Sequence, residues 1–170
     1  YLKIGPDSDK FLYDSVPQEI TIAVDSSGSV FLYHGDWGII HYFGPDHFYA
    51  FNVADAAGAE QIAATAAFLA ERYSGRGHGK VENWIVGNEV TARLEWNYIN
   101  IQDINLYVNE YAEAFRLFYN GIKSKNANAN VYICIDQQWD RNRREVGKYD
   151  SKDLIDVFNG NVSARGNIDW

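Results

Sequence analysis

The sequence predicts an α/β fold in which parallel strands alternate with helices, and three observations support this. Segments 81–88, which begins with the apolar run 81–86, and 131–135 have the length of buried strands. Residues 56–73 and 103–125 place apolar side chains on one helical face. A repeated β-α-β order requires parallel strands joined by right-handed crossovers, which leaves a doubly wound sheet or a (β/α)8 barrel.

The first half of the chain gives one hairpin and one βαβ unit. Residues 20–24 and 29–33 are β-like runs, and the polar turn between them is a hairpin signal. Residues 48–52 are expected to form a short strand before the helix at 56–73, and the glycine-rich residues 75–79 end that helix. The buried face of this helix is expected to contain Ile62, Ala66, Leu69, Ala70 and Tyr73.

The second half continues the alternation. The helix at 103–125 has the clearest periodicity and should cover a sheet. Asp103 at its start and two lysines at its end suit the helix dipole. Asp150 precedes another amphipathic helix, and residues 166–170 are expected to begin a further strand. The apolar stripe of the long helix consists of Ile104, Tyr107, Val108, Tyr111, Phe115, Phe118, Tyr119 and Ile122.

Chain length and loop lengths favour the barrel over the doubly wound sheet. A complete barrel takes about 250 residues, so residues 1–170 are interpreted as one domain, the N-terminal and middle part of a truncated TIM barrel. The expected post-strand loops, 90–102 and 136–149, are long, which indicates a functional rim. A barrel that stops there would expose an unpaired strand edge, so self-association through this edge is expected.

Composition narrows the classes of partner. The 46% hydrophobic content is ample for a core, and the net charge of -8 argues against nucleic acid. No apolar run approaches the roughly 20 residues that cross a bilayer. The single cysteine, Cys134, is expected to be a small buried hydrophobe, and the histidines lack metal-ligand spacing. Neither a cofactor nor a metal is predicted.

Glu89 is the strongest candidate for chemistry. It follows the apolar run at 81–86, and ligands bind at the carboxyl ends of strands in parallel sheets and barrels. A carboxylate beside an amide, here Asn88, suits a general acid that protonates a glycosidic oxygen while the amide binds a sugar hydroxyl. Asp136 is the next-best strand-end carboxylate, and a structural role is expected for it.

Aromatic and amide side chains in the two expected rim loops strengthen a carbohydrate interpretation. Sugar rings present apolar C–H faces that pack on tryptophan and tyrosine, while amides satisfy the hydroxyls. An oligo- or polysaccharide is therefore the expected substrate. The candidate substrate-binding residues are Trp96, Tyr98, Gln137, Gln138 and Trp139, together with Asn88.

These motifs resemble the clan A glycoside hydrolases, which are (β/α)8 barrels with Asn-Glu at the end of the fourth strand. Residues 84–89 match that pattern. The stretch from residue 48 to 170 is more similar still to a poorly characterised group of bacterial barrel proteins related to that clan. The resemblance implies retention of configuration, Glu89 as acid/base, Asn88 beside the cleavage point, and a nucleophile on the seventh strand, outside this chain. The fragment alone is then expected to be inactive.

Two alternatives from other classes remain open. One is a non-catalytic carbohydrate-binding or interaction module that has the aromatic rim without the carboxylate pair. The other is a doubly wound domain that binds a small ligand. The residues do not reveal the sugar, the linkage or the localisation, although export or a cell-surface position is common among relatives that degrade polymers.

Overall fold

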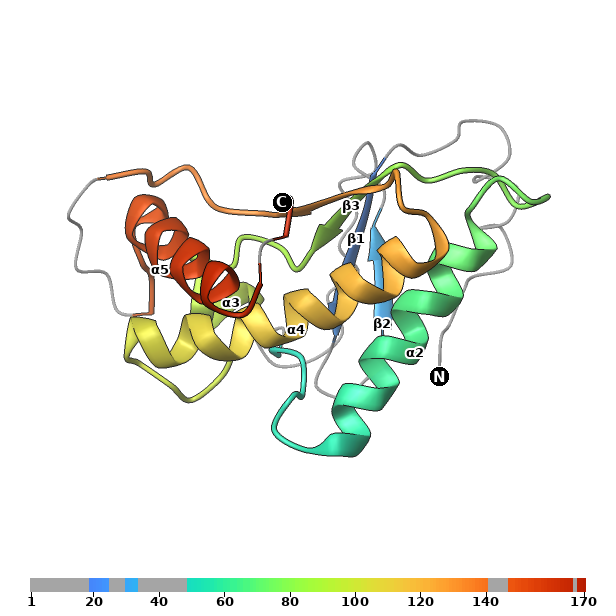
Figure 1. Ribbon diagram of the computed structural model, residues 1–170. Helices are drawn as coiled ribbons and strands as arrows, with labels where there is room; N and C mark the ends of the chain where they lie inside the picture. The colour runs from blue at the N-terminus through green and yellow to red at the C-terminus, as the bar shows by residue number, and fades with distance from the viewer. Residues whose placement is uncertain (1–18, 25–29, 34–48, 141–146, 167) are drawn as a thin grey trace.

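The computed structural model describes residues 19–24, 30–33, 49–140, 147–166 and 168–170, and it has a mixed α/β fold (Figure 1). Strands β1 (Glu19–Val24), β2 (Val30–Tyr33), β3 (Asn83–Val86) and β4 (Asn130–Ile133) form a sheet in the order β2-β1-β3-β4. The β1–β2 pair is antiparallel, whereas β1 and β4 both run parallel to β3. The predicted hairpin and the parallel strands are therefore confirmed.

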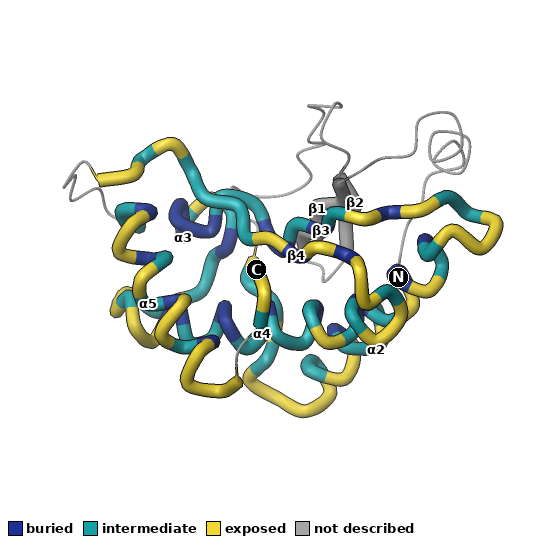
Figure 2. Tube along the Cα trace, turned by 45° about the horizontal axis from the view of Figure 1, so that its top comes forward, coloured by how far each residue is buried: buried dark blue, intermediate teal, exposed yellow. Residues whose placement is uncertain are grey.

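Three long helices lie on the same face of this sheet. These are α2 (Ala56–Arg72), α4 (Ile104–Lys125) and α5 (Ser151–Ala164), and α4 packs against both of the others. Figure 2 shows the helices on one side of the strands. A short helix, α3 (Arg93–Trp96), interrupts the long loop after β3 and was not predicted.

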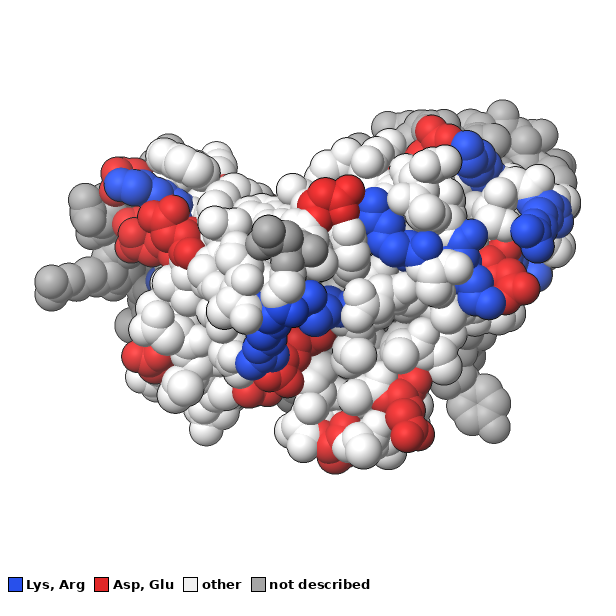
Figure 3. All heavy atoms as spheres, viewed as in Figure 1, with Lys and Arg blue, Asp and Glu red and all other residues white. Residues whose placement is uncertain are grey.

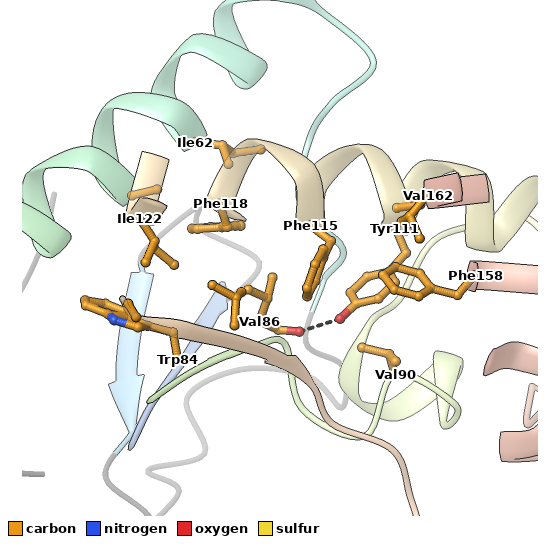
Figure 4. Packing of buried hydrophobic residues seen from close by; sticks show 14 of the residues in the cluster. Ile62, Trp84, Val86, Val90, Tyr111, Phe115, Phe118, Ile122, Phe158 and Val162 are labelled. Carbon is orange, nitrogen blue, oxygen red and sulfur yellow. Dashed lines mark hydrogen bonds between the residues drawn. The ribbon is translucent and has the colours of Figure 1, made fainter. Parts of the chain in front are cut away.

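The core lies between the strands and these helices. Alternate residues of a strand point to opposite faces. On β3, Trp84 and Val86 are buried and register with Val131 and Ile133 of β4, so this face meets the helices. The predicted faces of the helices at 56–73 and 103–125 are likewise buried or partly buried (Figure 4).

The two helix contacts differ in chemistry. Where α4 meets α2, a Cβ on Gly121 would lie only 2.7 Å from the Cβ of Ala66, so the small residue permits close approach. Where α4 meets α5, aromatic rings fill the space: Phe115 and Phe158 pack edge to face with centroids 5.1 Å apart. Small residues therefore pack α4 against α2, and aromatic rings pack it against α5.

The predicted strand at 48–52 is wrong for its described part, because Tyr49 makes only an isolated parallel bridge with Tyr98. The following residues serve α2 instead. Asn52 accepts a hydrogen bond from the Ala54 N–H, and Asp55 caps the helix through the Gly58 N–H at 2.7 Å. Accordingly, β1 takes the place beside β3 that was expected for residues 48–52.

The predicted strand at 166–170 is also wrong in its described part. Asp169 hydrogen-bonds the Tyr119 hydroxyl and pairs with Lys123 at 3.2 Å, so its side chain serves α4. The Trp170 ring packs edge to face on Phe158, with centroids 4.8 Å apart. These contacts fix the segment over the helices and not in the sheet.

Candidate functional site

The turn after β3 has a backbone conformation that residues other than glycine rarely adopt. Glu89 has a φ of 37°, and no other non-glycine residue in the described chain has a positive φ. Gly87, two residues earlier, has a φ of 80°. Non-glycine residues in this region cost about 1–3 kcal/mol and persist where surrounding contacts enforce them. Such backbone conformations concentrate at functional sites. The one described non-glycine residue with a positive φ, Glu89, is also the residue that the sequence singled out.

Backbone hydrogen bonds fix both ends of this turn. The Glu89 carbonyl accepts from the Ala92 N–H at 2.7 Å, and the Val90 N–H donates to the Cys134 carbonyl at 2.9 Å. Two tyrosine hydroxyls from α4 add to them: Tyr111 donates to the Val86 carbonyl and Tyr107 to the Val90 carbonyl, each at 2.6 Å. Figure 4 shows the Tyr111 hydroxyl directed at Val86.

Asn88 and Glu89 are both partly buried, and they differ in their contacts. The Asn88 Oδ1 accepts from the Cys134 Sγ at 3.6 Å. The Glu89 carboxylate makes no hydrogen bond or ion pair with a described residue. Cys134 is only partly buried, against the prediction, because β4 ends at Ile133 and the thiol already lies at the rim.

The segment after β4 is connected to the Glu89 turn through Thr91. The buried Thr91 hydroxyl accepts from the Asp136 N–H at 2.9 Å. The Asp136 carboxylate in turn accepts from the Gln138 N–H at 2.6 Å, which is an Asx turn. This contact is consistent with the structural role predicted for Asp136.

The other candidate binding residues of this segment differ in exposure. Gln137 is exposed, and the Trp139 side chain is 55% exposed. Gln138 is half-buried, and its carbonyl accepts from the Ser151 N–H at 2.9 Å. Trp139 therefore presents an aromatic surface to solvent, whereas the backbone of Gln138 supports the start of α5.

Tyr98 lies in a groove that is separate from the Glu89 turn. It lines an open groove of about 290 Å³ together with Tyr49, Asn100 and Glu110, and Glu89 is not among the lining residues. The Tyr49 and Tyr98 rings meet edge to face with centroids 5.5 Å apart. Trp96 is a half-buried residue at the end of α3. The structure thus groups Asn88 and Glu89 with the β4 segment, and Tyr98 with Tyr49.

A buried polar cluster beneath the rim was missed by sequence reasoning. Arg93 is only 4% exposed and donates to the Ile99 carbonyl at 2.5 Å. The buried Asn97 side chain donates to the Tyr107 hydroxyl at 2.7 Å. Burial is the main cause that raises the pKa of Tyr107, so this phenol stays a protonated donor. The sequence contained a signal for this cluster. Tyr107 and Tyr111 lie one turn apart on the predicted buried stripe, and buried tyrosine hydroxyls usually have hydrogen-bond partners.

Residues 40–170 match a family of unknown function, DUF5722. The chain belongs to this family. The DUF5722 region contains β3, β4, helices α2 to α5 and the whole Glu89 turn, while the β1–β2 hairpin precedes it. No curated protein and no solved structure matches the chain.

The described DUF5722 region has a surface of mixed charge and shows neither a metal-binding cluster nor a membrane-spanning helix. On the face in Figure 3, basic side chains lie among acidic ones and do not form one continuous basic surface. The pairs include Lys125 with Glu71 at 3.0 Å. In the described part of the chain, no three His, Cys, Asp or Glu residues are grouped to hold a metal ion. None of its helices combines the length and apolarity needed to cross a membrane.

Proposed function

We propose that this chain is part of a retaining glycoside hydrolase in which Glu89 is the general acid/base. The observation that carries the proposal is a partly buried glutamate, unpaired among the described residues, in a left-handed turn at the carboxyl end of a parallel strand. Catalytic groups in α/β barrels occupy this position. The neighbouring Asn88 amide would bind a substrate hydroxyl beside the cleaved bond.

The arrangement of the helices supports a partial (β/α)8 barrel as the scaffold. In a doubly wound sheet, helices cover both faces, whereas in a barrel they all lie outside the strands. Here α2, α4 and α5 share one face (Figures 1 and 2). The opposite face would then be the barrel interior, where Asn83 accepts a hydrogen bond from the Asn130 amide at 3.0 Å.

In the proposed reaction, Glu89 first donates its proton to the glycosidic oxygen as a second carboxylate attacks the anomeric carbon. The carbon–oxygen bond breaks, the alcohol leaves, and a glycosyl-enzyme forms. Glu89 then removes a proton from water, which attacks the same carbon and releases the sugar with its configuration retained. The nucleophile must approach to about 5–5.5 Å and would come from residues outside this chain.

A non-catalytic carbohydrate-binding module is the second candidate function. The exposed ring of Trp139 favours it, because an exposed aromatic face can bind a sugar without any carboxylate pair. This alternative gives Glu89 no chemical role. The two functions are therefore separated by changing Glu89 alone.

The test is Glu89→Gln in the longest natural polypeptide that contains the chain, assayed against a panel of oligosaccharides. General acid–base catalysis contributes about 10²–10⁴-fold, so kcat should fall by that factor while oligosaccharide binding persists. Glu95→Gln is the matched control, because Glu95 is exposed and lies on α3. Unchanged turnover in Glu89→Gln would remove Glu89 from the mechanism. Binding without turnover in the unchanged protein would favour the module.

A further inference from the structure

We propose that Tyr107 and Tyr111 are positioning residues that hold Glu89 in its left-handed conformation. This inference rests on the proposed function of Glu89 and adds the device that orients it. The two tyrosines lie one helical turn apart on α4, so their side chains share one face of the helix. Their hydroxyls donate to the carbonyls of Val86 and Val90, which bracket the turn.

Burial makes these two hydrogen bonds hard to replace. Val86 and Val90 are both 0% exposed, so their carbonyls are not accessible to water. A buried carbonyl that loses its donor retains the full desolvation cost. The turn therefore depends on the two phenols to satisfy the carbonyls at its entrance and exit.

The tyrosines are themselves held by independent contacts. The Tyr111 ring packs against Phe158 of α5, with centroids 5.7 Å apart. The Tyr107 ring lies 5.2 Å from that of Tyr149, and its hydroxyl also accepts from Asn97. Two fixed donors on a packed helix define where both ends of the turn lie, which restricts the φ of the residue between them.

The protonation state of the two phenols is constant over the working range of a glycosidase. Burial is the first cause that raises the pKa of both Tyr107 and Tyr111 above the ordinary tyrosine value. A raised pKa keeps each phenol protonated, and therefore a donor, at neutral and mildly alkaline pH. The positioning device should consequently be insensitive to pH over this range.

The test compares Tyr107→Phe, Tyr111→Phe and the double variant with Tyr73→Phe. Tyr73 is the matched control, because it is equally buried and its hydroxyl has no hydrogen-bond partner among the described residues. In the 170-residue chain, we expect amide hydrogen exchange at Val90 and Ala92 to accelerate about 10-fold in each Tyr107 or Tyr111 variant. Backbone chemical shifts of Glu89 should move as well, and Tyr73→Phe should change neither readout.

The dependence of activity on the leaving group distinguishes positioning of Glu89 from a merely structural role of the two tyrosines. In the active polypeptide, a misplaced acid should slow glycosides with poor leaving groups about 10-fold more than activated aryl glycosides, which need little protonation. Equal slowing of both substrates, or wild-type exchange at Val90 and Ala92 in the double variant, would overturn the proposal. Failure of the proposed function is read separately, from unchanged turnover in Glu89→Gln.

Discussion

The segments that follow the two parallel strands β3 and β4 are built in opposite ways. After β3, the turn at Glu89 is fixed by phenols from α4 and by the Cys134 carbonyl, and its flanking valines are buried. After β4, Gln137 and Trp139 are exposed, and the segment is held by hydrogen bonds to the Thr91 hydroxyl and to the start of α5. Under the proposed function, the buried turn would carry the acid/base and the exposed segment would contact the substrate.

Gly87→Ala should have the largest effect on stability, because it forces the rigid segment out of its conformation. A Cβ at this φ of 80° is strained and would lie 3.0 Å from the Cγ1 of Val90. We expect a loss of about 1–3 kcal/mol in the free energy of unfolding, measured by urea denaturation. The matched control is Gly160→Ala in α5, where nothing lies within 4 Å of the added Cβ. That control should stabilise the protein by about 1 kcal/mol. The same change in unfolding free energy for Gly87→Ala and Gly160→Ala would contradict the account of a rigid turn.

Thr91→Val should have a smaller effect and should separate the two segments. The substitution keeps the shape of the side chain but removes the hydroxyl that accepts from the Asp136 N–H. An unsatisfied buried donor costs about 1–3 kcal/mol, and because Asp136 is only half-buried we expect the lower end of that range. Thr91→Ser, which keeps the hydroxyl, should preserve the chemical shifts of residues 136–138. If Thr91→Val leaves those shifts in place, the hydroxyl does not join the segments.

Trp139→Ala should have the smallest effect on stability. An exposed side chain away from buried networks changes the unfolding free energy by less than about 0.5 kcal/mol. The affinity for an oligosaccharide substrate should nevertheless fall about 5-fold, measured by calorimetry on the Glu89→Gln protein, because an aromatic platform contributes about 1 kcal/mol. A large loss of stability with unchanged affinity would reverse the assigned roles of the two segments.

Sequence periodicity was enough to locate the long helices but not the short α3, because α2 and α4 bury most of the apolar stripes read from their residues. It failed in the described parts of residues 48–52 and 166–170, which do not form strands of the sheet. In both places a side-chain contact decides the outcome, namely Asp55 capping α2 and Asp169 binding α4. Such long-range or capping contacts leave no periodic signal.

The candidate site was predictable only in part, because periodicity locates strands and helices but not the paths of loops. Glu89 was located by the strand before it, and its left-handed backbone adds a feature that no pattern of residue types reveals. Tyr98 was expected on the same rim as Trp139 but lies in the groove with Tyr49, because the β3 loop contains α3 and then returns to pair with that residue. Loop paths depend on such pairings, so residues in one loop need not share a site.

The role of Glu89 as acid/base is tested most directly by chemical rescue of Glu89→Ala in the active polypeptide. On an activated aryl glycoside the first step needs little acid, so a glycosyl-enzyme should accumulate. Added azide should attack its anomeric carbon without a general base, restore turnover, and give a glycosyl azide of retained configuration. Wild-type turnover in Glu89→Ala without azide, or a lost activity that azide does not restore, would contradict the assignment of Glu89 as the general acid/base.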